Sequence, residues 1–369
     1  MASPDTVRTA TSAFIVRLFL AAAGCLALSS GTGAQQNSLS GLIPFESYLE
    51  SLRVQAGIPG MSAILLQDGE VVWERGLGFQ NQESRIRATP DTPYPIADLN
   101  QTLAATLVLH CTEQRRLALT DPIQRYGESV PEPNATIRQL LSHTSANSGD
   151  AFQYDPERFA KLTRAVESCI EQPYRKTVAV ELLERFAMKD SVPGRDVVTT
   201  FAGTQSQQQL FSAEVMERYR RVLDRLAVPY KVDKRGRLTR SELQPEGINA
   251  ASGLVSTVRD LARFDAALDT GLLIREDTRN LAWSNVQSSQ NTAIPTGLGW
   301  FVQNYRNDRV VWHFGLVPNA YSSLIIKLPA RRLTFILLAN SDGLSAPFQL
   351  DAGDITRSLF ATLFLRLYT

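Results

Sequence analysis

One stretch constrains the fold of this chain more than any other, and it reads Tyr94-Pro-Ile-Ala-Asp-Leu-Asn-Gln-Thr-Leu-Ala-Ala-Thr-Leu-Val-Leu109. Leucine recurs every fourth residue from Leu99 to Leu107, which predicts a buried helix entered from a short strand or turn. Asp98 lies where this helix should begin, and Gln101 follows three residues later. A carboxylate there can accept the first free backbone N–H groups, and an amide can reach back, so the pair predicts a capping box.

Composition narrows the class of protein. The 369 residues are 44% hydrophobic and 20% charged, which is enough apolar material for a sizeable core and argues against disorder. A formal net charge of +1 gives no electrostatic reason to expect a nucleic-acid partner. The three histidines and three cysteines show no metal-ligand spacing, so we predict neither a metal nor another cofactor.

The first residues are typical of an export signal. Arg8 and Arg17 precede an apolar run, and the small residues Thr32-Gly33-Ala34 follow as a cleavage site. We therefore expect a signal peptide over 1–34, a mature domain over 35–369, and a periplasmic or extracellular location. A lipoprotein signal, acylated at Cys25, is the alternative. No later segment approaches the roughly 20 apolar residues that a membrane helix needs.

Two cysteines remain after the leader. Cys111 continues the buried helix, and a buried free thiol is the simpler prediction for it. A disulfide with Cys169 is the alternative in an oxidising compartment, but sequence cannot bring the two within bonding distance.

Strand patterns lie at both ends of the chain. Residues 61–67 and 70–75 flank Asp68-Gly69, which predicts a hairpin. Near the C-terminus, strand-like segments recur at 298–303, 310–314, 321–328 and 333–339, and Ile355, Leu359, Leu363 and Leu367 predict a closing helix. We therefore expect an α+β fold whose single antiparallel sheet is built from both chain ends, with a helical subdomain over about 98–265. The irregular part at 195–247 is either a lid or, more simply, a charged solvated face.

Five segments, in order, carry a resemblance to the serine β-lactamase and penicillin-binding-protein superfamily. They are the central helix, Leu117-Ala-Leu-Thr-Asp-Pro-Ile123, Ile137-Arg-Gln-Leu-Leu-Ser-His-Thr-Ser145, Ala251-Ser-Gly-Leu-Val-Ser-Thr-Val-Arg-Asp-Leu-Ala-Arg-Phe264, and Gly297-Leu-Gly-Trp300 with His313-Phe-Gly315. The chain is most similar to the branch of class C β-lactamases, D-amino peptidases and esterases. The resemblance implies a three-layer α/β/α, transpeptidase-like fold and acyl transfer through an activated serine.

The resemblance also assigns positions to individual residues. Asp98 and Gln101 stand where the family carries Ser-x-x-Lys, as the substituted nucleophile and the substituted base. Tyr154 occupies the tyrosine of a Tyr-x-Asn loop, and Pro156 replaces its asparagine. His313 occupies the edge-strand position. Gly315 and Trp300 match substrate-binding positions, and no serine in the chain has a lysine three residues on.

These substitutions decide which chemistry is open to the chain. Glutamine is neither an acid nor a base near neutral pH, so a nucleophile at position 98 has no local activator. We expect the helix N-terminus to stabilise the Asp98 anion and to lower its basicity. A helix cap on a retained scaffold is therefore the simpler interpretation of the pair.

Three functional hypotheses follow. The first is an exported, catalytically degenerate module that binds a small molecule, a peptide, a cell-wall fragment or a protein partner. The second is an active hydrolase of an ester, amide or β-lactam that uses Asp98, Tyr154 and His313. The third is a structural protein whose groove is filled. The oligomeric state stays open.

The aromatic and imidazole side chains each have a structural alternative to a role at the site. We expect Tyr154 to lie in the pocket, with a packed aromatic residue as the alternative, and we expect Trp300 to be a core residue rather than a ligand platform. Strand alternation should turn His313 to the opposite face from its two neighbours, and we expect it to face the pocket. We expect His143 to be a hydrogen-bonding loop residue rather than a base.

Overall fold

The computed structural model describes residues 32–132, 134–199 and 210–369. The expected signal peptide and Cys25 lie almost wholly outside these residues, and both stay predictions. Backbone contacts divide the chain at Gly41. Residues 32–41 are the first turns of α1 (Thr32–Gln55), and Leu42–Thr369 form the unit described below. None of the helices in the described part of the chain is long and apolar enough to cross a membrane.

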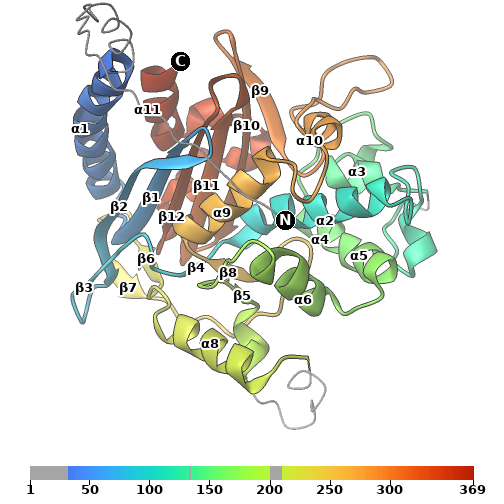
Figure 1. The fold of residues 1–369 in the computed structure, drawn as a ribbon, viewed down its shortest axis with the longest axis horizontal. Helices are drawn as coiled ribbons and strands as arrows, with labels where there is room; N and C mark the ends of the chain where they lie inside the picture. Colours follow the sequence, from blue (N-terminus) through green and yellow to red (C-terminus); the bar gives the residue numbers. More distant parts are fainter. Residues whose placement is uncertain (1–31, 133, 200–209) are drawn as a thin grey trace, which may run out of the picture. The chain divides into compact units, whose positions relative to one another are not determined.

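A seven-stranded sheet in the order β3-β2-β1-β12-β11-β10-β9 forms the centre of this unit (Figure 1). Each neighbouring pair of strands is antiparallel. The bounds are β1 Gly60–Gln67, β2 Glu70–Asn81, β3 Ile86–Arg87, β9 Phe301–Tyr305, β10 Asp308–Val317, β11 Tyr321–Leu328 and β12 Leu333–Ala339. Because β1 pairs with β12, the sheet joins the two ends of the chain, which confirms the predicted α+β class.

The predicted hairpin is present. Gln67 faces Glu70 across the β1–β2 pair, and the two connecting residues, Asp68 and Gly69, have φ of +56° and +80°. Two successive positive φ values are those of a type I′ turn, which matches the right-handed twist of the strands and explains the Asp-Gly pair.

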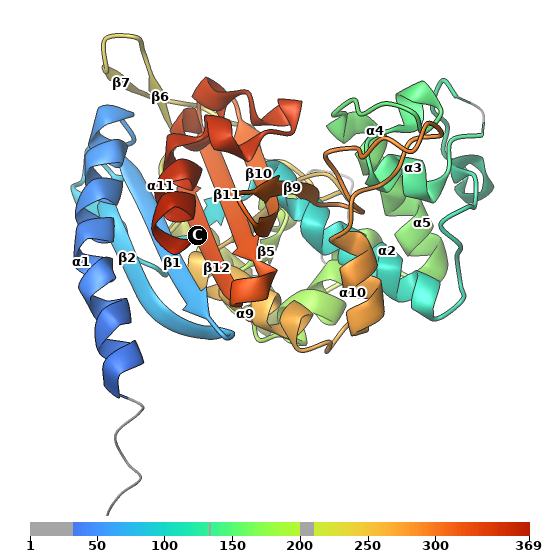
Figure 2. The same ribbon diagram turned by 90° about the horizontal axis from the view of Figure 1, so that it is seen from above.

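Helices cover both faces of the sheet (Figure 2). On one face, Phe45 of α1 packs against Trp73 of β2 and Phe335 of β12, at centroid distances of 5.4 and 5.3 Å. The closing helix α11 (Leu359–Tyr368) adds Phe364, which stacks on Phe335. The other face packs against α2 (Asn100–Glu113) and α9 (Val258–Asp269). The sheet is therefore the middle of three layers.

The predicted closing helix is present as α11, but the row of leucines does not mark its buried face. Leu359 and Leu367 are exposed, whereas Phe360 and Phe364 are buried. The two phenylalanines offer more apolar area to the sheet than the leucines do, and this larger area decides which way the helix turns.

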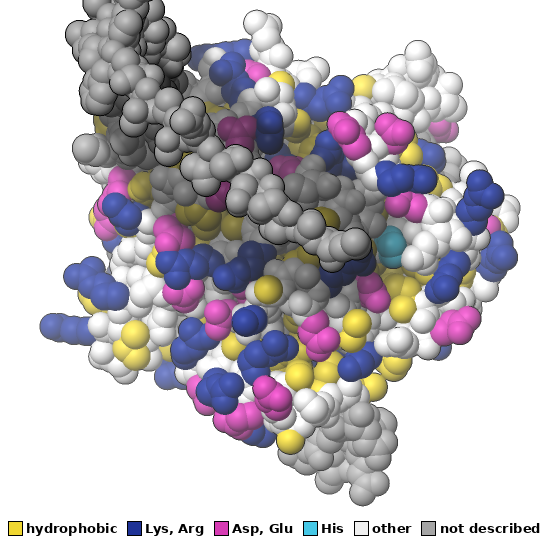
Figure 3. Space-filling view, in the orientation of Figure 1, with side chains coloured by type: hydrophobic (Ala, Val, Ile, Leu, Met, Phe, Trp, Pro, Cys, Tyr) yellow, Lys and Arg dark blue, Asp and Glu magenta, His cyan; other side chains and the backbone are white. Residues whose placement is uncertain are grey.

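Along the chain, the predicted helical subdomain lies between the two groups of strands. The helices in its described residues are α2, α3 (Ile137–Leu141), α4 (Pro156–Ala160), α5 (Leu162–Ile170), α6 (Tyr174–Thr177), α8 (Ala213–Asp224) and α9, and α10 (Glu276–Ala282) follows them. Small sheets join β4 (Tyr94–Pro95), β8 (Leu254–Ser256) and β5 (Val192–Pro193), and β6 (Tyr230–Val232) with β7 (Leu238–Arg240). The irregular stretch after 195 thus holds α8 and one hairpin. Figure 3 shows cationic and anionic side chains interspersed over the face it draws.

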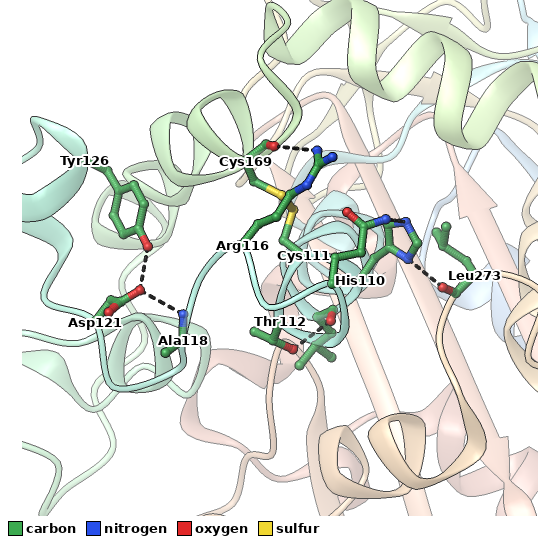
Figure 4. The surroundings of a disulfide bond; sticks show 11 residues. His110, Cys111, Thr112, Arg116, Ala118, Asp121, Tyr126, Cys169 and Leu273 are labelled. Carbon is green, nitrogen blue, oxygen red and sulfur yellow. Dashed lines mark hydrogen bonds between the residues drawn. A yellow bond between two sulfur atoms is a disulfide. The ribbon is translucent and has the colours of Figure 1, made fainter.

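A disulfide joins α2 to α5 (Figure 4). Cys111 and Cys169 are bonded, with Cα atoms 6.2 Å apart, so the prediction of a free thiol is wrong. The guanidinium of Arg116 donates to the carbonyl oxygen of Cys169 at 2.9 Å beside the bond. The partners are 58 residues apart in sequence, and only the packing of α2 on α5 brings them together.

Candidate active site

The chain enters α2 through a strained turn. Ile96 donates its N–H to Leu254 of β8, and Ala97 then takes φ of +51°, which is unusual for a residue with a side chain. A 3₁₀ turn over Ala97–Leu99 leads into the helix. This turn places Asp98 against the end of β10.

Asp98 contacts the sheet and does not cap the helix. Its Oδ2 accepts the backbone N–H of Leu316 on β10, at 3.4 Å. Neither the 3₁₀ turn nor α2 has a side-chain cap. The predicted capping box is therefore wrong, because β10 runs close enough to Asp98 for its backbone donor to take the place of the helix N–H groups.

Burial sets the electrostatics of Asp98. Removal from water raises the pKa of the carboxyl to about 7, and the negative charge of Glu246 acts in the same direction. The N–H of Leu316 lowers it in part. Among the described residues, no cationic side chain forms an ion pair with Asp98. The expectation of lowered basicity is thus wrong, since desolvation outweighs the helix N-terminus.

Gln101 is fully buried and points away from the helix start. Its Oε1 accepts from Nε2 of His143 at 2.8 Å, and its Nε2 lies 3.2 Å from the hydroxyl of Tyr154 and donates to it. The amide thus uses both an acceptor and a donor to connect two side chains from different segments.

His143 is held in one tautomer. Nδ1 accepts the backbone N–H of Asp155 at 3.1 Å, so the ring proton lies on Nε2, facing Gln101. Burial lowers the pKa of His143 to about 3, and the nearby His313 acts in the same direction. His143 is thus a neutral, hydrogen-bonding loop residue, as predicted. Its backbone φ is +51°, which is not a right-handed helical conformation.

Tyr154 accepts the hydrogen bond from the Gln101 amide and packs among aromatic rings. Its ring lies 4.5 Å from that of His143 and 5.2 Å from that of Phe314, measured between centroids. Burial, with the charge of Asp98 as the next cause, raises the pKa of the phenol well above 10. Next in the chain, Asp155 caps α4 by accepting the N–H of Arg158, and Pro156 opens that helix.

His313 and Gly315 lie on β10. His313 is opposite Ile325 on β11, and its neighbours Trp312 and Phe314 belong to the core on the other face, as alternation predicts. Its Nδ1 donates to the carbonyl oxygen of Phe314 at 2.7 Å, and burial lowers its pKa to about 4.

Position 315 requires glycine because β10 passes very close to the turn before Asp98. A Cβ there would lie 2.2 Å from the carbonyl oxygen of Ile96 and 2.3 Å from Oγ of Ser323. The strand can therefore pass the turn before Asp98 only if this residue has no side chain. Trp300, by contrast, is 2% exposed and packs edge-on against Trp283 at 6.2 Å. The structure thus places Trp300 in the hydrophobic core.

The geometry brings Asp98, Gln101, Tyr154 and His313 together, and it adds residues that sequence reasoning missed. His143 is the partner of Gln101, Leu316 is the backbone donor to Asp98, and Glu246 is the nearby charge. The place of His143 beside the central helix was not visible, because 42 residues separate it from Gln101.

Only Asp98 among these side chains titrates near neutral pH. The two histidines are neutral above about pH 4, Tyr154 keeps its proton, and Gln101 carries no charge. The site can therefore hold or release one proton at a carboxyl group, and it can present hydrogen bonds from neutral groups.

Comparisons with known proteins agree on one relationship. A family model described as Beta-lactamase matches residues 45–358. The chain is 24% identical over 307 residues to Penicillin-binding protein 4* of Bacillus subtilis (strain 168), covering 76% of this chain and 68% of that protein. It is 21% identical over 327 residues to Protein flp of Staphylococcus aureus (strain MW2), covering 77% and 60%.

Solved structures show the same fold. The octameric penicillin-binding protein homologue from Pyrococcus abyssi superimposes with a TM-score of 0.70 at 20% identity, over 88% of this chain and 77% of that chain. The D-alanine carboxypeptidase AmpC from Burkholderia cenocepacia gives a TM-score of 0.66 at 17% identity, over 88% and 99%.

Proposed function

The chain belongs to the Beta-lactamase family, and we propose that it has lost serine acyl transfer and acts as an exported binding or regulatory module. The contact between the Asp98 carboxylate and the backbone N–H of Leu316 carries this proposal. Acyl transfer by this family needs a nucleophilic hydroxyl, a base one helical turn away and backbone donors for the oxyanion. At this site a carboxyl group replaces the hydroxyl and takes one such donor for itself.

Two further features support the loss of acyl transfer. Gln101, at the position of the base, accepts a hydrogen bond from His143 and donates one to Tyr154, and both partners are neutral. An ionised Asp98 would also repel the negative charge that develops on a substrate carbonyl oxygen. In hydrolases, loss of the nucleophile or of the base commonly lowers the rate by a factor on the order of a thousand or more.

The edge of the sheet gives the module a surface for a ligand. β9 pairs with β10 only as far as Trp312, so the described strands leave residues 313–317 paired with β11 alone. Two groups of this edge already have partners in the chain, the Leu316 N–H at Asp98 and the Phe314 carbonyl oxygen at His313, so an extended peptide would add to the edge by displacing these contacts with its own backbone hydrogen bonds. A peptide or a cell-wall fragment is therefore the ligand class that we propose for this surface.

Binding and turnover together test this proposal. Co-sedimentation with purified peptidoglycan should retain the mature protein, while hydrolysis of a generic ester should not exceed that of Asp98→Asn. Absence of binding to peptidoglycan and to extended peptides would contradict the binding role. Ester turnover that depends on Asp98 would contradict the loss of catalysis.

A second candidate function has one observation in its favour. A carboxyl group whose pKa lies near 7 is suited to general-base catalysis at neutral pH. A hydrolase of this kind would activate a water molecule at Asp98, with Tyr154 as a hydrogen-bond donor. Its rate would rise as the pH increases through about 7 and would be lost in Asp98→Asn, which distinguishes it from the binding module.

A further inference from the structure

A basic hairpin projects from the unit that holds the sheet. It consists of β6 and β7, which pair in antiparallel register so that Tyr230 faces Arg240 and Val232 faces Leu238. Figure 2 shows this hairpin standing out from the sheet and the helices that cover it. Residues 234–240 are all exposed, and a Cβ added at Gly236, in the connecting turn, would meet no atom within 4 Å. The end of the hairpin is therefore open to a partner.

The turn of the hairpin is held by its backbone and by one carboxylate. Asp233 donates its N–H to the carbonyl oxygen of Arg237, and its Oδ1 accepts the N–H groups of Arg235 at 2.8 Å and of Arg237 at 3.0 Å. Gly236 supplies the left-handed φ of +74° that the turn needs. The side chains of Lys234 and Arg235 take no part in these contacts, so the conformation of the turn does not depend on them.

Cationic side chains outnumber carboxylates on the hairpin. The cations are Lys231, Lys234, Arg235, Arg237 and Arg240, and the carboxylate is that of Asp233. Arg237 forms an ion pair of 2.6 Å with Asp233, and Arg240 lies close enough to Glu83 for their charges to interact. In the part of the chain that the structure describes, the other three cations form no ion pair, and each of them is exposed. They are therefore available to an anionic partner from outside the chain.

The shape of the hairpin restricts that partner. A projecting turn presents its side chains outward, whereas a site for one small ligand needs polar groups that converge on it. An extended anionic surface, by contrast, can be met by several outward-pointing cations at once. Leu238 lies beside these cations and is 40% exposed. An apolar side chain among cations suits the interface of a bilayer, where apolar groups enter the headgroup region, better than it suits a water-soluble acidic polymer.

We propose that the β6–β7 hairpin binds the surface of a bilayer that contains anionic phospholipids. Lys231, Lys234 and Arg235 lie against the lipid phosphates, and Leu238 enters the headgroup region. The formal net charge of the whole chain is only +1, but carboxylates elsewhere are screened from a projecting turn, since the Debye length in physiological salt is about 8 Å. So few cations give peripheral, reversible binding that salt weakens. The inference is independent of the function proposed for Asp98.

Co-sedimentation with vesicles tests this proposal on the mature chain. Phosphatidylcholine vesicles with about 30% phosphatidylglycerol should retain the parent in about 0.02 M salt and release it in about 0.5 M salt, where the Debye length is only about 4 Å. Vesicles of phosphatidylcholine alone should not retain it. Lys234→Gln/Arg235→Gln removes two free cations and should weaken binding to the anionic vesicles about thirtyfold.

A matched control changes the same charge elsewhere. Arg220→Gln/Arg221→Gln on α8 also removes two exposed cations, but both of these pair with Glu217. This variant should bind the anionic vesicles as the parent does, which separates an effect of the hairpin from an effect of net charge. Circular dichroism and the Tm of both variants should match those of the parent, since neither pair of side chains holds the fold.

Other outcomes overturn the proposal. No retention of the parent by anionic vesicles at low salt would show that the hairpin does not bind a bilayer. Equal retention of the parent and of Lys234→Gln/Arg235→Gln would show that these cations do not face the lipid. Retention on soluble polyglutamate without retention on vesicles would assign the hairpin to an acidic polymer instead.

Discussion

The Asp98 carboxyl is held by backbone N–H groups and by no cationic side chain among the described residues. Its pKa in the folded state, about 7, lies above the unfolded value of 3.8. A raised folded pKa means that the protonated form is favoured by folding. The stability that this contributes is complete below the unfolded pKa and is lost as the pH rises toward and through 7.

Asp98→Asn should therefore gain stability relative to the parent as the pH rises from 4 to 8. The gain has an upper limit of about 4 kcal/mol and should be smaller, since the side chain is partly exposed. Urea unfolding of both proteins at pH 5 and pH 8 measures it, because groups common to both cancel in the difference. A difference that is constant over this range would contradict the raised pKa.

Gln101 offers a second test at the scale of a residue. Gln101→Met keeps the volume but removes both hydrogen bonds, and it leaves the Nε2–H of His143 buried without an acceptor. We expect a loss of about 1–3 kcal/mol in the free energy of unfolding. Leu103→Met, an apolar exchange on the same helix, should cost less than about 1.5 kcal/mol. Equal costs for the two variants would show that the polar contacts contribute nothing.

The position of Asp98 could be predicted from sequence, but its contacts could not. The spacing of leucines after Asp98 placed it at the start of α2, and that was correct in outline. Its cap and its lowered pKa were wrong because both depend on β10, more than 200 residues away, which supplies the competing N–H and the burial. Local sequence patterns predict contacts with nearby backbone donors, whereas the hydrogen bond and the burial of Asp98 depend on a strand that is distant in sequence.

At the scale of elements, the α2–α5 disulfide should stabilise the fold. Closing a 58-residue span restricts the unfolded chain, and the chain-entropy estimate is about 4 kcal/mol. A reductant should lower the Tm of the mature parent but not of the Cys111→Ala/Cys169→Ala variant. Two titratable thiols in the parent, measured under denaturing conditions without reductant, would contradict the bond.

The close contact between β10 and the turn before α2 allows a second test at the scale of elements. Gly315→Ala drives a methyl group onto the backbone of Ile96, and neither strand nor turn can yield easily. We expect a loss of about 2 kcal/mol or more. Gly236→Ala has open space around it and only a positive φ, so it should cost about 1 kcal/mol. Similar costs at the two sites would show that the crossing is not tight.

Elements were easier to predict than their faces. The Asp-Gly turn and the strands of the sheet were predicted from short patterns, because turn chemistry and alternation are local properties. The buried face of α11 was not, because Phe360 and Phe364 compete with a leucine row of equal periodicity. The prediction of a free thiol at Cys111 was wrong for a related reason, since its pairing with Cys169 depends on how α2 meets α5.

The whole molecule keeps the family's architecture around a changed centre. The sheet built from both chain ends followed from strand patterns at 61–75 and 298–339, and the family model spans 45–358. Exchange of the central pair for Ser and Lys, as D98S/Q101K, should then confer labelling by a fluorescent penicillin. Failure of a folded double variant to react would show that more than the pair has diverged.

The loss of acyl transfer is tested most directly by the intact mass of the unaltered mature protein after incubation with a β-lactam. We predict that the mass stays that of the polypeptide alone, because a carboxyl group at position 98 and an amide at position 101 cannot form and resolve an acyl ester. A mass increase equal to the β-lactam, mapped to any side chain, would contradict this.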